Sequence, residues 1–498
     1  MLLALCVPKP ALAPLGWVAL APLCLAVLRT AQLPSPRGAR PFMLGLVTGL
    51  VAFGGTVSWT SEVLAVFGGL NLAVSWALTG VLIAYLAIYP ALFSVMLTAT
   101  VARAGPQAVM LAPVVWVAFE WLRGTVFTGF PWVLLGYSQS DTIAPLQVAS
   151  LVGIYGLSAL VALPAAALAL LLAPGPRGRG HGRIAATAIG VVALAWAWGA
   201  WRVGQQALFD GPIARVGIVQ GNVPQDQKWD PAHRDDILRR YLDLTRQVAA
   251  LGVDLVIWPE SSTPFVFGRD ALPTEIMRAA VVRAGVPVVF GSDEIEGAGD
   301  RFYNAAFLID PSGEVRGSYR KMQLVPFGEY VPLRSLLFFA QPLVERTSDF
   351  SAGERVTLLP LGGHKLSVAV CYEAVFPWLS RQAVRDGSQL LTTVTNDAWY
   401  GRSAAPYQHF EQARVRAVET GRYLVRAANT GISGVVDPYG RVLVRSPLFE
   451  TGVYTGEVRW LSGATVYTRI GDSVPWACML VTVLLIVVWR WPVRPRWR

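Results

Sequence analysis

Residues 367–377 read Ser-Val-Ala-Val-Cys-Tyr-Glu-Ala-Val-Phe-Pro, and the rest of the chain is organised around this stretch. Its first four residues predict a short buried strand, so Cys371 is held where that strand ends, a place where nucleophiles are found. The other cysteines, Cys6, Cys24 and Cys478, lie in apolar runs, where a thiol behaves as a small hydrophobic side chain. A lone cysteine in a globular stretch is usually an inert core residue, so the case for Cys371 depends on its partners upstream.

The composition indicates a membrane protein. Of the 498 residues, 54% are hydrophobic and only 15% are charged, and the mean hydropathy is +0.46. Soluble domains carry about 25% charged residues. Residues 1–8 are apolar but too short to cross a bilayer, which takes roughly 20 residues. Whether the chain has an eighth span at its amino terminus therefore stays open. The seven predicted spans are residues 11–28, 41–61, 63–102, 104–119, 142–176, 184–201 and 473–489.

Basic residues orient these spans, because Lys and Arg stay on the cytoplasmic side of short loops. They fall in every alternate connection, at residues 29–40, at Arg103, at residues 177–183 and at residues 490–498. We therefore expect a multi-pass protein with residues 203–472 on the outer face. The net charge of +10 then reflects topology and anionic lipid, and we expect no nucleic-acid partner.

Residues 203–472 predict a separate domain, set between a helical bundle at residues 1–202 and a last helix with a basic tail at residues 473–498. Short β-branched runs alternate there with amphipathic helical patterns. This alternation predicts an α/β layered domain whose functional residues emerge at strand ends. Two turn sequences, Asp310-Pro-Ser-Gly313 and Asp437-Pro-Tyr-Gly440, predict hairpins and therefore a mixed sheet.

Three stretches carry candidate catalytic side chains. Glu260 follows an apolar strand pattern, either as a helix-capping acid or as a general base whose apolar surroundings raise its pKa. Lys321 lies between a strand and a Pro-rich aromatic loop, so it is less solvated than a surface lysine, and Glu329 could hold its ammonium group. The third stretch is Cys371 with Glu373. None of the three decides the function alone.

Taken in order, the three stretches resemble the nitrilase, or carbon–nitrogen hydrolase, superfamily. They read Trp-Pro-Glu-Ser, then Arg-Lys followed by Pro-Phe-Gly-Glu-Tyr-Val-Pro, then Cys-Tyr-Glu, and Glu260, Lys321 and Cys371 are 61 and 50 residues apart. Residues 395–401 and 429–433 add to the likeness. The resemblance implies an α-β-β-α sandwich for residues 203–472, carried by a polytopic helical bundle of seven to eight spans.

Two further stretches resemble one membrane-embedded branch of that superfamily, the apolipoprotein N-acyltransferases. They are residues 220–230, which include Lys228-Trp229-Asp230, and residues 128–139, which begin Thr-Gly-Phe-Pro-Trp. The resemblance implies an enzyme of the bacterial inner membrane. It would move an acyl chain from a phospholipid, through a cysteine thioester, to the α-amine of the diacylglyceryl-cysteine of an apolipoprotein.

The same resemblance implies a role for each candidate. Cys371 would be the nucleophile and Glu260 its base, because an ester can become an amide in two steps through a thioester. Lys321 and the main-chain N–H of Tyr372 would face the oxyanion, and Glu329 would keep Lys321 charged.

Supporting groups and partners follow from that picture. Glu373 would order the local network. The expected partners are the phospholipid donor, the diacylated apolipoprotein and the membrane, with the chain as a monomer and no cofactor. No metal is expected, because the histidines lack metal-ligand spacing and are interpreted as surface or packing residues. They are His181, His233, His364 and His409.

Two other functions stay open at this point. A membrane-tethered amidase or nitrilase would hydrolyse its thioester with water, and a non-enzymatic membrane partner of a polyprenol-phosphate mannosyl synthase would need no catalysis. The intact set of Glu260, Lys321 and Cys371 argues against the second, and the bundle argues against an amidase of soluble substrates. Within the bundle, Glu120 and Arg123 either bind a lipid head group or pair with each other.

Apolar side chains are candidates for binding the acyl chain. Trp229 and Trp399 are either core aromatics or walls of an acyl pocket, and Asn304 is a candidate substrate contact. Residues 331–340 form an apolar segment that is either a lid resting in the outer leaflet or an amphipathic helix packed on the domain. Residues 265–267 would form the opposite lip. The candidate contacts within the lid are Leu336, Phe338 and Phe339.

Overall fold

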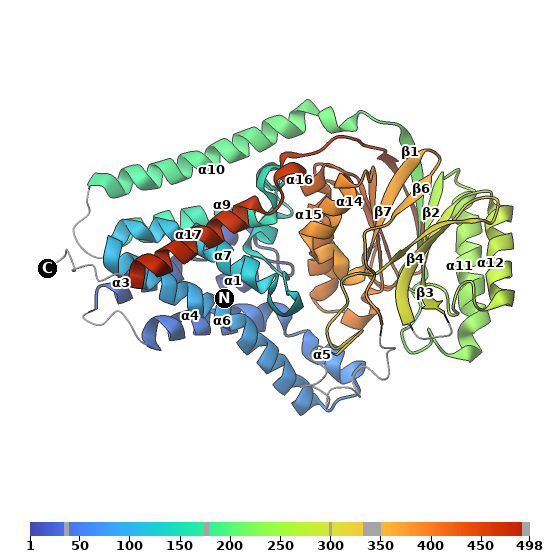
Figure 1. Cartoon of the computed structure of the whole chain (residues 1–498), viewed down its shortest axis with the longest axis horizontal. Coiled ribbons are helices and arrows are strands. Elements are labelled where there is room, and N and C mark those ends of the chain that lie inside the picture. Colours follow the sequence, from blue (N-terminus) through green and yellow to red (C-terminus); the bar gives the residue numbers. More distant parts are fainter. Residues whose placement is uncertain (34–38, 174–178, 298–300, 332–349, 491–498) are drawn as a thin grey trace. The chain divides into compact units, whose positions relative to one another are not determined.

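The chain forms two compact units, Met1–Gln206 with Ile470–Arg498, and Ala207–Arg469. Figure 1 shows their elements in the colours of the sequence. The computed structural model describes residues 1–33, 39–173, 179–297, 301–331 and 350–490.

The first unit is helical. Among the described residues, five helices are long and apolar enough to cross a membrane: Ala13–Ala31, Ala39–Val57, Leu72–Ala104, Ala149–Leu171 and Gly180–Phe209. The elements of this unit are α1 (Leu2–Leu5), α2 (Ala13–Gly16), α3 (Ala21–Ala31), α4 (Ala39–Val57), α5 (Thr60–Val66), α6 (Leu72–Ala104), α7 (Ala112–Arg123), α8 (Ile143–Leu146), α9 (Ala149–Leu171), α10 (Arg179–Gln205) and α17 (Ser473–Arg490).

The count of seven to eight spans stays a prediction. The expected span at residues 104–119 is divided into a 3-10 helix, Pro106–Leu111, and the 12-residue α7. Pro106 and Pro113 each stand in the first turn of a segment, where the missing N–H of proline leaves no helical hydrogen bond unmade. The apolar helix Ser473–Val488 is shorter than the five long ones.

Glu120 and Arg123 hold the backbone of the loop that follows α7. The Glu120 carboxylate accepts a hydrogen bond from the Leu135 amide at 2.7 Å. The Arg123 guanidinium donates to the carbonyls of Phe130 and Trp132 at 2.9 and 2.7 Å. Both side chains are buried. These contacts give both side chains a structural role. The two sequence-based alternatives, binding of a lipid head group and pairing with each other, stay predictions.

The second unit contains two six-stranded mixed sheets. β1, β2 and β3 are parallel in the first sheet, as are β7, β8 and β9 in the second. Both predicted hairpins are confirmed, because β4 pairs antiparallel with β5 and β10 with β11. In spatial order the first sheet is β12 (Gly452–Arg459), β1 (Ile213–Gln220), β2 (Leu255–Ile257), β3 (Val288–Glu296), β4 (Arg301–Ile309) and β5 (Val315–Arg320). The second is β11 (Val442–Arg445), β10 (Gly434–Val436), β9 (Leu424–Ala428), β8 (Leu390–Thr395), β7 (His364–Val370) and β6 (Leu358–Leu361).

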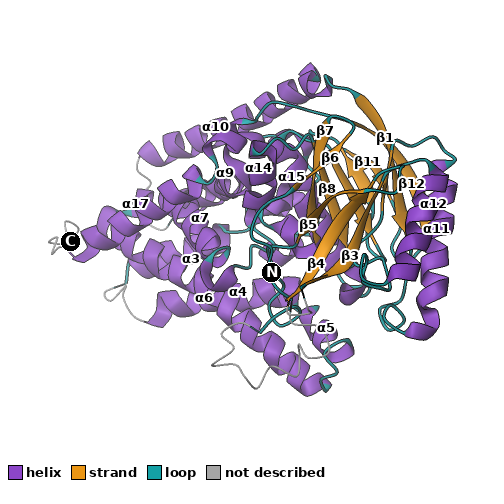
Figure 2. Ribbon diagram, turned by 45° about the vertical axis from the view of Figure 1, so that its right-hand side comes forward, coloured by secondary structure: helices purple, strands orange, loops and turns teal. Residues whose placement is uncertain are grey.

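Helices cover the outer faces of the two sheets. In Figures 1 and 2, α11 (Arg234–Ala249) and α12 (Ala271–Ala284) lie on one side of the strands, and α14 (Pro377–Arg385) and α15 (Ala405–Thr420) on the other. One buried apolar cluster joins the first sheet to α11 and α12, and another joins the second sheet to α14 and α15. The predicted order of layers, helix, sheet, sheet, helix, is confirmed.

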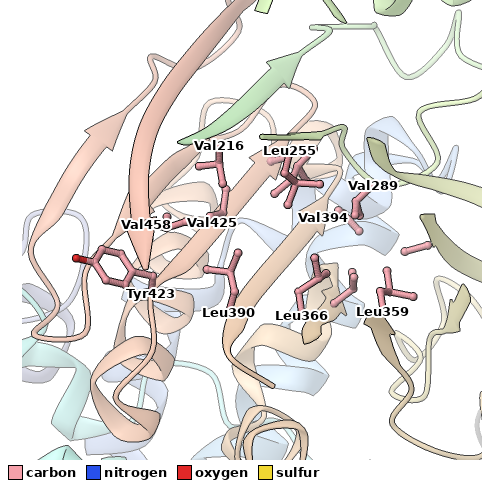
Figure 3. Close-up of a cluster of buried hydrophobic side chains, with 14 of the residues drawn as sticks. Val216, Leu255, Val289, Leu359, Leu366, Leu390, Val394, Tyr423, Val425 and Val458 are labelled. Atoms are coloured by element: carbon pink, nitrogen blue, oxygen red, sulfur yellow. The ribbon is translucent and has the colours of Figure 1, made fainter. Parts of the chain in front are cut away.

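The core between the sheets is made mostly of branched aliphatic side chains (Figure 3). Val216, Leu255 and Val289 from the first sheet meet Leu366 and Val394 from the second, and all five are fully buried. Burying apolar surface contributes about 25 cal/mol per Å². This core fixes the two sheets against each other, so residues just beyond β2 and β7 occupy fixed places.

The turn after β2 is packed against β3 without room for a side chain. A Cβ atom added to Gly291 would lie 2.6 Å from the Cα atom of Glu260 and 2.5 Å from the main-chain nitrogen of Ser261. The Gly291 amide also donates to the Pro259 carbonyl at 3.1 Å. A glycine at this position therefore allows the turn that carries Glu260 to approach the strand.

We predict that Gly291→Ala destabilises the protein by about 1–3 kcal/mol, because the methyl group must displace backbone and not a flexible side chain. Thermal unfolding of the purified protein in detergent would measure the loss. The matched control is Gly204→Ala in α10, where an added methyl group meets no atom within 4 Å. Equal unfolding temperatures for the two variants would contradict the prediction.

Candidate active site

Glu260 stands just beyond β2 and is buried. One carboxylate oxygen accepts from Asn304 Nδ2 at 2.8 Å and from Lys321 Nζ at 3.4 Å, and the other accepts from the Asn396 amide at 2.8 Å. Burial by itself would raise the pKa of Glu260, but the charges of Lys321 and Lys228 and these hydrogen bonds outweigh it and lower the pKa. The expected raised pKa is therefore wrong, because the surroundings of Glu260 are cationic and not only apolar.

Lys321 follows β5 and is 1% exposed. Its Nζ donates to Glu329 at 2.8 Å, closer than its 3.4 Å contact with Glu260. Burial would lower the pKa of Lys321, but the charges of Glu329 and Glu260 raise it overall, so the ammonium stays charged. Asn304 Nδ2 donates to the same oxygens of Glu260 and Glu329, at 2.8 and 3.0 Å. Asn304, a candidate substrate contact from the sequence, here links the two carboxylates.

Cys371 is the first residue after β7 and is buried. Its φ of +53° lies in the left-handed region, which costs a non-glycine residue free energy and which surrounding contacts must support. Burial raises the pKa of the Cys371 thiol, the negative charge of Glu260 raises it further, and Lys321 opposes this. At neutral pH the thiol is therefore protonated, and it needs a base to become a nucleophile.

Glu373 ties the ends of two strands together. Its buried carboxylate accepts from Tyr319 Oη at 2.7 Å and from the amides of Met322 at 2.6 Å and Gln323 at 3.1 Å, all beside Lys321. Its other oxygen accepts from the Val370 amide at 2.7 Å, beside Cys371. These four bonds keep the exits of β5 and β7 adjacent. Tyr372, the expected oxyanion donor, is buried and packs its ring on Phe376, with ring centroids 5.0 Å apart.

A buried charged cluster behind Cys371 was missed in the sequence. His409 Nε2 lies 3.0 Å from the Cys371 carbonyl, and its Nδ1 lies 3.0 Å from Asp397 Oδ1. Arg426 pairs with Asp397 at 2.9 Å, and all three side chains are fully buried. His409 was interpreted as a surface or packing residue. The available signal was Arg426 in the apolar strand Leu-Val-Arg-Ala-Ala, since a charge in a buried strand needs a buried partner.

Lys228 is a second lysine at this site, and it was quoted from the sequence without a role. It is 4% exposed, and its Nζ donates to the Glu260 carbonyl at 3.2 Å. Burial lowers the pKa of Lys228 to about 8. Burial also raises the pKa of the nearby Asp293 to about 6.

The candidate acyl-binding residues differ in where the structure places them. Trp229 is 47% exposed, and Trp399 is half-buried in the 3-10 helix Asp397–Tyr400. Phe265 and Phe267 are core residues packed with α11, α12 and the first sheet, so the proposed lip at 265–267 is wrong. The segment 265–267 turns inward because its aromatic rings fill the layer between helix and sheet. The lid residues Leu336, Phe338 and Phe339 lie outside the described residues.

Comparisons with known proteins cover both units. Residues 215–463 match the carbon-nitrogen hydrolase family, and residues 1–167 match the apolipoprotein N-acyltransferase N-terminal domain. An apolipoprotein N-acyltransferase of Geobacter metallireducens is 39% identical over 96% of this chain and 91% of its own. Another, of Methylococcus capsulatus, is 38% identical over 93% of this chain and 90% of its own. Among solved structures, an amidase of Nesterenkonia sp. is 24% identical over 52% of this chain and 94% of its own, with a TM-score of 0.39.

We predict that Arg426→Met destabilises the protein by about 3–5 kcal/mol, because it leaves the Asp397 carboxylate buried without its ion pair. The double variant Arg426→Met/Asp397→Asn should recover part of this loss, since the uncompensated charge is gone. Thermal unfolding would measure both. Arg239→Met is the matched control: its ion pair with Asp236 is exposed on α11, and such pairs contribute about 0–1 kcal/mol. A double variant no more stable than Arg426→Met would contradict the argument.

Proposed function

Because the chain belongs to the apolipoprotein N-acyltransferase family, we propose that it moves an acyl chain from a membrane phospholipid to the α-amine of a diacylated lipoprotein cysteine. It is an acyltransferase of the carbon–nitrogen hydrolase superfamily and a bacterial membrane protein that acts on lipoproteins. The observation that carries the finer proposal is a Cys371 side chain buried beyond the end of β7, on which the charges of Glu260 and Lys321 act. That arrangement suits nucleophilic acyl transfer.

In the first half of the reaction, Glu260 takes the proton of the Cys371 thiol and the thiolate attacks the ester carbonyl of the phospholipid. The negative charge that develops on the carbonyl oxygen faces the Lys321 ammonium and the main-chain N–H of Tyr372. When the tetrahedral intermediate collapses, the bond to the glycerol oxygen breaks. Glu260 returns its proton to that oxygen, and a lysophospholipid leaves a thioester on Cys371.

In the second half, the α-amine of the lipoprotein attacks the thioester. An α-amine has a pKa of about 7.7–8.0, so much of it arrives as an ammonium and must lose one proton to water before it can attack. As the C–N bond forms, Glu260 takes a proton from nitrogen, and the departing Cys371 sulfur receives it. The C–S bond breaks, the amide is complete and the thiol is restored.

Placement in the membrane completes the proposal. Residues 1–202 form the membrane bundle, residues 203–472 stand on the outer face, and residues 473–498 contribute a last span and a cytoplasmic basic tail. The alternation of basic loops supports this orientation. The site then meets phospholipid from the outer leaflet and lipoproteins already exported, and one chain suffices for the reaction. Family membership sets aside the non-enzymatic alternative and leaves a hydrolase as the competitor.

We expect wild-type protein given phospholipid alone to accumulate a thioester on Cys371 that neutral hydroxylamine cleaves. With a synthetic diacylated lipopeptide it should form N-acylated peptide and lysophospholipid in equal amounts, measured by mass spectrometry. Cys371→Ser should form neither, because a serine hydroxyl is far harder to ionise than a thiol. Release of free fatty acid whether or not the acceptor is present would identify a hydrolase instead.

The roles of the two charged partners are tested in single turnovers. Lys321→Met should slow thioester formation by about 10²–10³, the usual effect of losing one oxyanion donor. Glu260→Gln should slow it by about 10²–10⁴, the usual contribution of a general base. Glu275→Gln, an exposed carboxylate on α12, and Lys365→Met, an exposed lysine on β7, are matched controls. A normal rate in either active-site variant would remove that residue from its role.

A further inference from the structure

Lys228 is a buried ammonium group for which the reaction described above has no use. It lies in the connection between β1 and α11, and its Nζ donates a hydrogen bond to the Glu260 carbonyl at 3.2 Å. No carboxylate forms an ion pair with it among the residues that the structure describes. A buried charge without an ion pair costs several kcal/mol. Such a cost is tolerated where the charge has a function.

The connection that carries Lys228 is bonded to the ends of β8 and β9. The amides of Asn222 and Val223 donate to the Asn429 carbonyl and side chain at 3.0 and 2.9 Å. Asn396 Nδ2 donates to Gln225 Oε1 at 2.6 Å. The main-chain N–H of Asn396 also donates to the Glu260 carboxylate, so one hydrogen-bond network connects Glu260 to the segment that carries Lys228. The ammonium group is thus held in place by the fold.

The charges around Glu260 show why a second cation matters. Three carboxylates, Glu260, Glu329 and Asp293, share the site with Lys321 and Lys228. Lys321 is 2.8 Å from Glu329 and 3.4 Å from Glu260, so its ammonium interacts more strongly with Glu329 than with Glu260. Lys228 acts electrostatically on Glu260, Asp293 and Cys371. It therefore supplies the positive charge that the carboxylates would otherwise lack.

We propose that Lys228 is a positioning residue, which holds the Glu260 backbone through its hydrogen bond and keeps the Glu260 carboxylate ionised through its charge. Glu260 can then accept the proton of Cys371. This inference rests on the base role given to Glu260 in the proposed function and adds the group that maintains it. The effect applies to both halves of the reaction, since Glu260 serves in each.

The direction of the effect on pH dependence follows from charge alone. Removing a positive charge beside Glu260 raises the pKa of Glu260, so a higher pH is needed to ionise it. The same change disfavours the Cys371 thiolate, which also moves reactivity to higher pH. Lys228 itself has a pKa of about 8, so its charge is present across the neutral range where Glu260 must act. Within the described part of the chain, the titratable groups around Glu260 are Lys321, Lys228, Asp293, Glu329, Cys371 and Tyr400.

The test compares Lys228→Met, which removes both charge and hydrogen bond, with Lys228→Gln, which keeps an N–H donor. Lys365→Met is the control for loss of a lysine charge in the same domain. Alkylation of Cys371 by iodoacetamide is followed by peptide mass spectrometry from about pH 3 to about pH 8. The series starts at low pH because the pKa of Glu260 is lowered, and the ionisation of Glu260 sets the acid limb of the rate. Thermal unfolding establishes that each variant is folded.

We expect the acid limb of both Lys228 profiles to move upward by about one pH unit, which is about tenfold slower alkylation below it. Above the limb the difference should shrink, and Lys365→Met should match wild type. A pH-independent loss would mean a merely structural role and would overturn the proposal, as would unchanged profiles. A wild-type profile in Lys228→Gln would overturn the role of charge.

Alkylation needs no acyl donor, so the two proposals fail separately. If wild-type protein transferred no acyl group but the limb still moved in the Lys228 variants, the proposed function would be wrong and the role of Lys228 would stand. If acyl transfer proceeded and the limb did not move, the reverse would hold. The same variants can then be measured for thioester formation, where the pH shift should recur.

Discussion

The ion pairs of the buried Lys321 ammonium are the interaction on which the active site depends. Burial alone would lower the pKa of Lys321 and favour the neutral amine. The negative charges of Glu329 and Glu260, at 2.8 and 3.4 Å, raise the pKa and keep the ammonium charged. Asn304 spans the same two carboxylate oxygens, so the three charged groups cannot move apart independently. A charged donor held in a dry site stabilises a developing oxyanion far better than one exposed to water. Burying the Lys321 ammonium is unfavourable, but the same burial is what makes it effective at stabilising an oxyanion.

The two sheets make that arrangement possible because they bring strand ends from distant parts of the chain to one place. Glu373 bonds the exit of β5 to the exit of β7, and His409 lies against the carbonyl of the strained residue Cys371. Strain of this kind survives only where the surroundings hold it from several sides. The Asp397 and Arg426 pair behind His409 provides that support from within the second sheet.

The pKa values of Cys371 and Glu260 keep the nucleophile protonated before a substrate binds. The pKa of the Cys371 thiol is raised and that of Glu260 is lowered, so the proton stays on sulfur until a substrate is bound. A protonated thiol reacts slowly with oxidants and electrophiles. The Lys321 ammonium then stabilises the negative charge that develops on the substrate. This stabilisation offsets the unfavourable proton transfer from Cys371 to Glu260.

The sequence by itself determined the apolar runs, the alternating α/β texture, the two hairpins and the three motifs around Glu260, Lys321 and Cys371, because each of these patterns lies within a short window of the chain. Only the tertiary structure revealed Lys228 and the His409 cluster, since Lys228, His409 and Arg426 are 32, 38 and 29 residues from Glu260, Cys371 and Asp397 in the chain. It also reversed the expected pKa shift of Glu260. Sign and size of such a shift depend on distances between charges, and folding alone sets those distances.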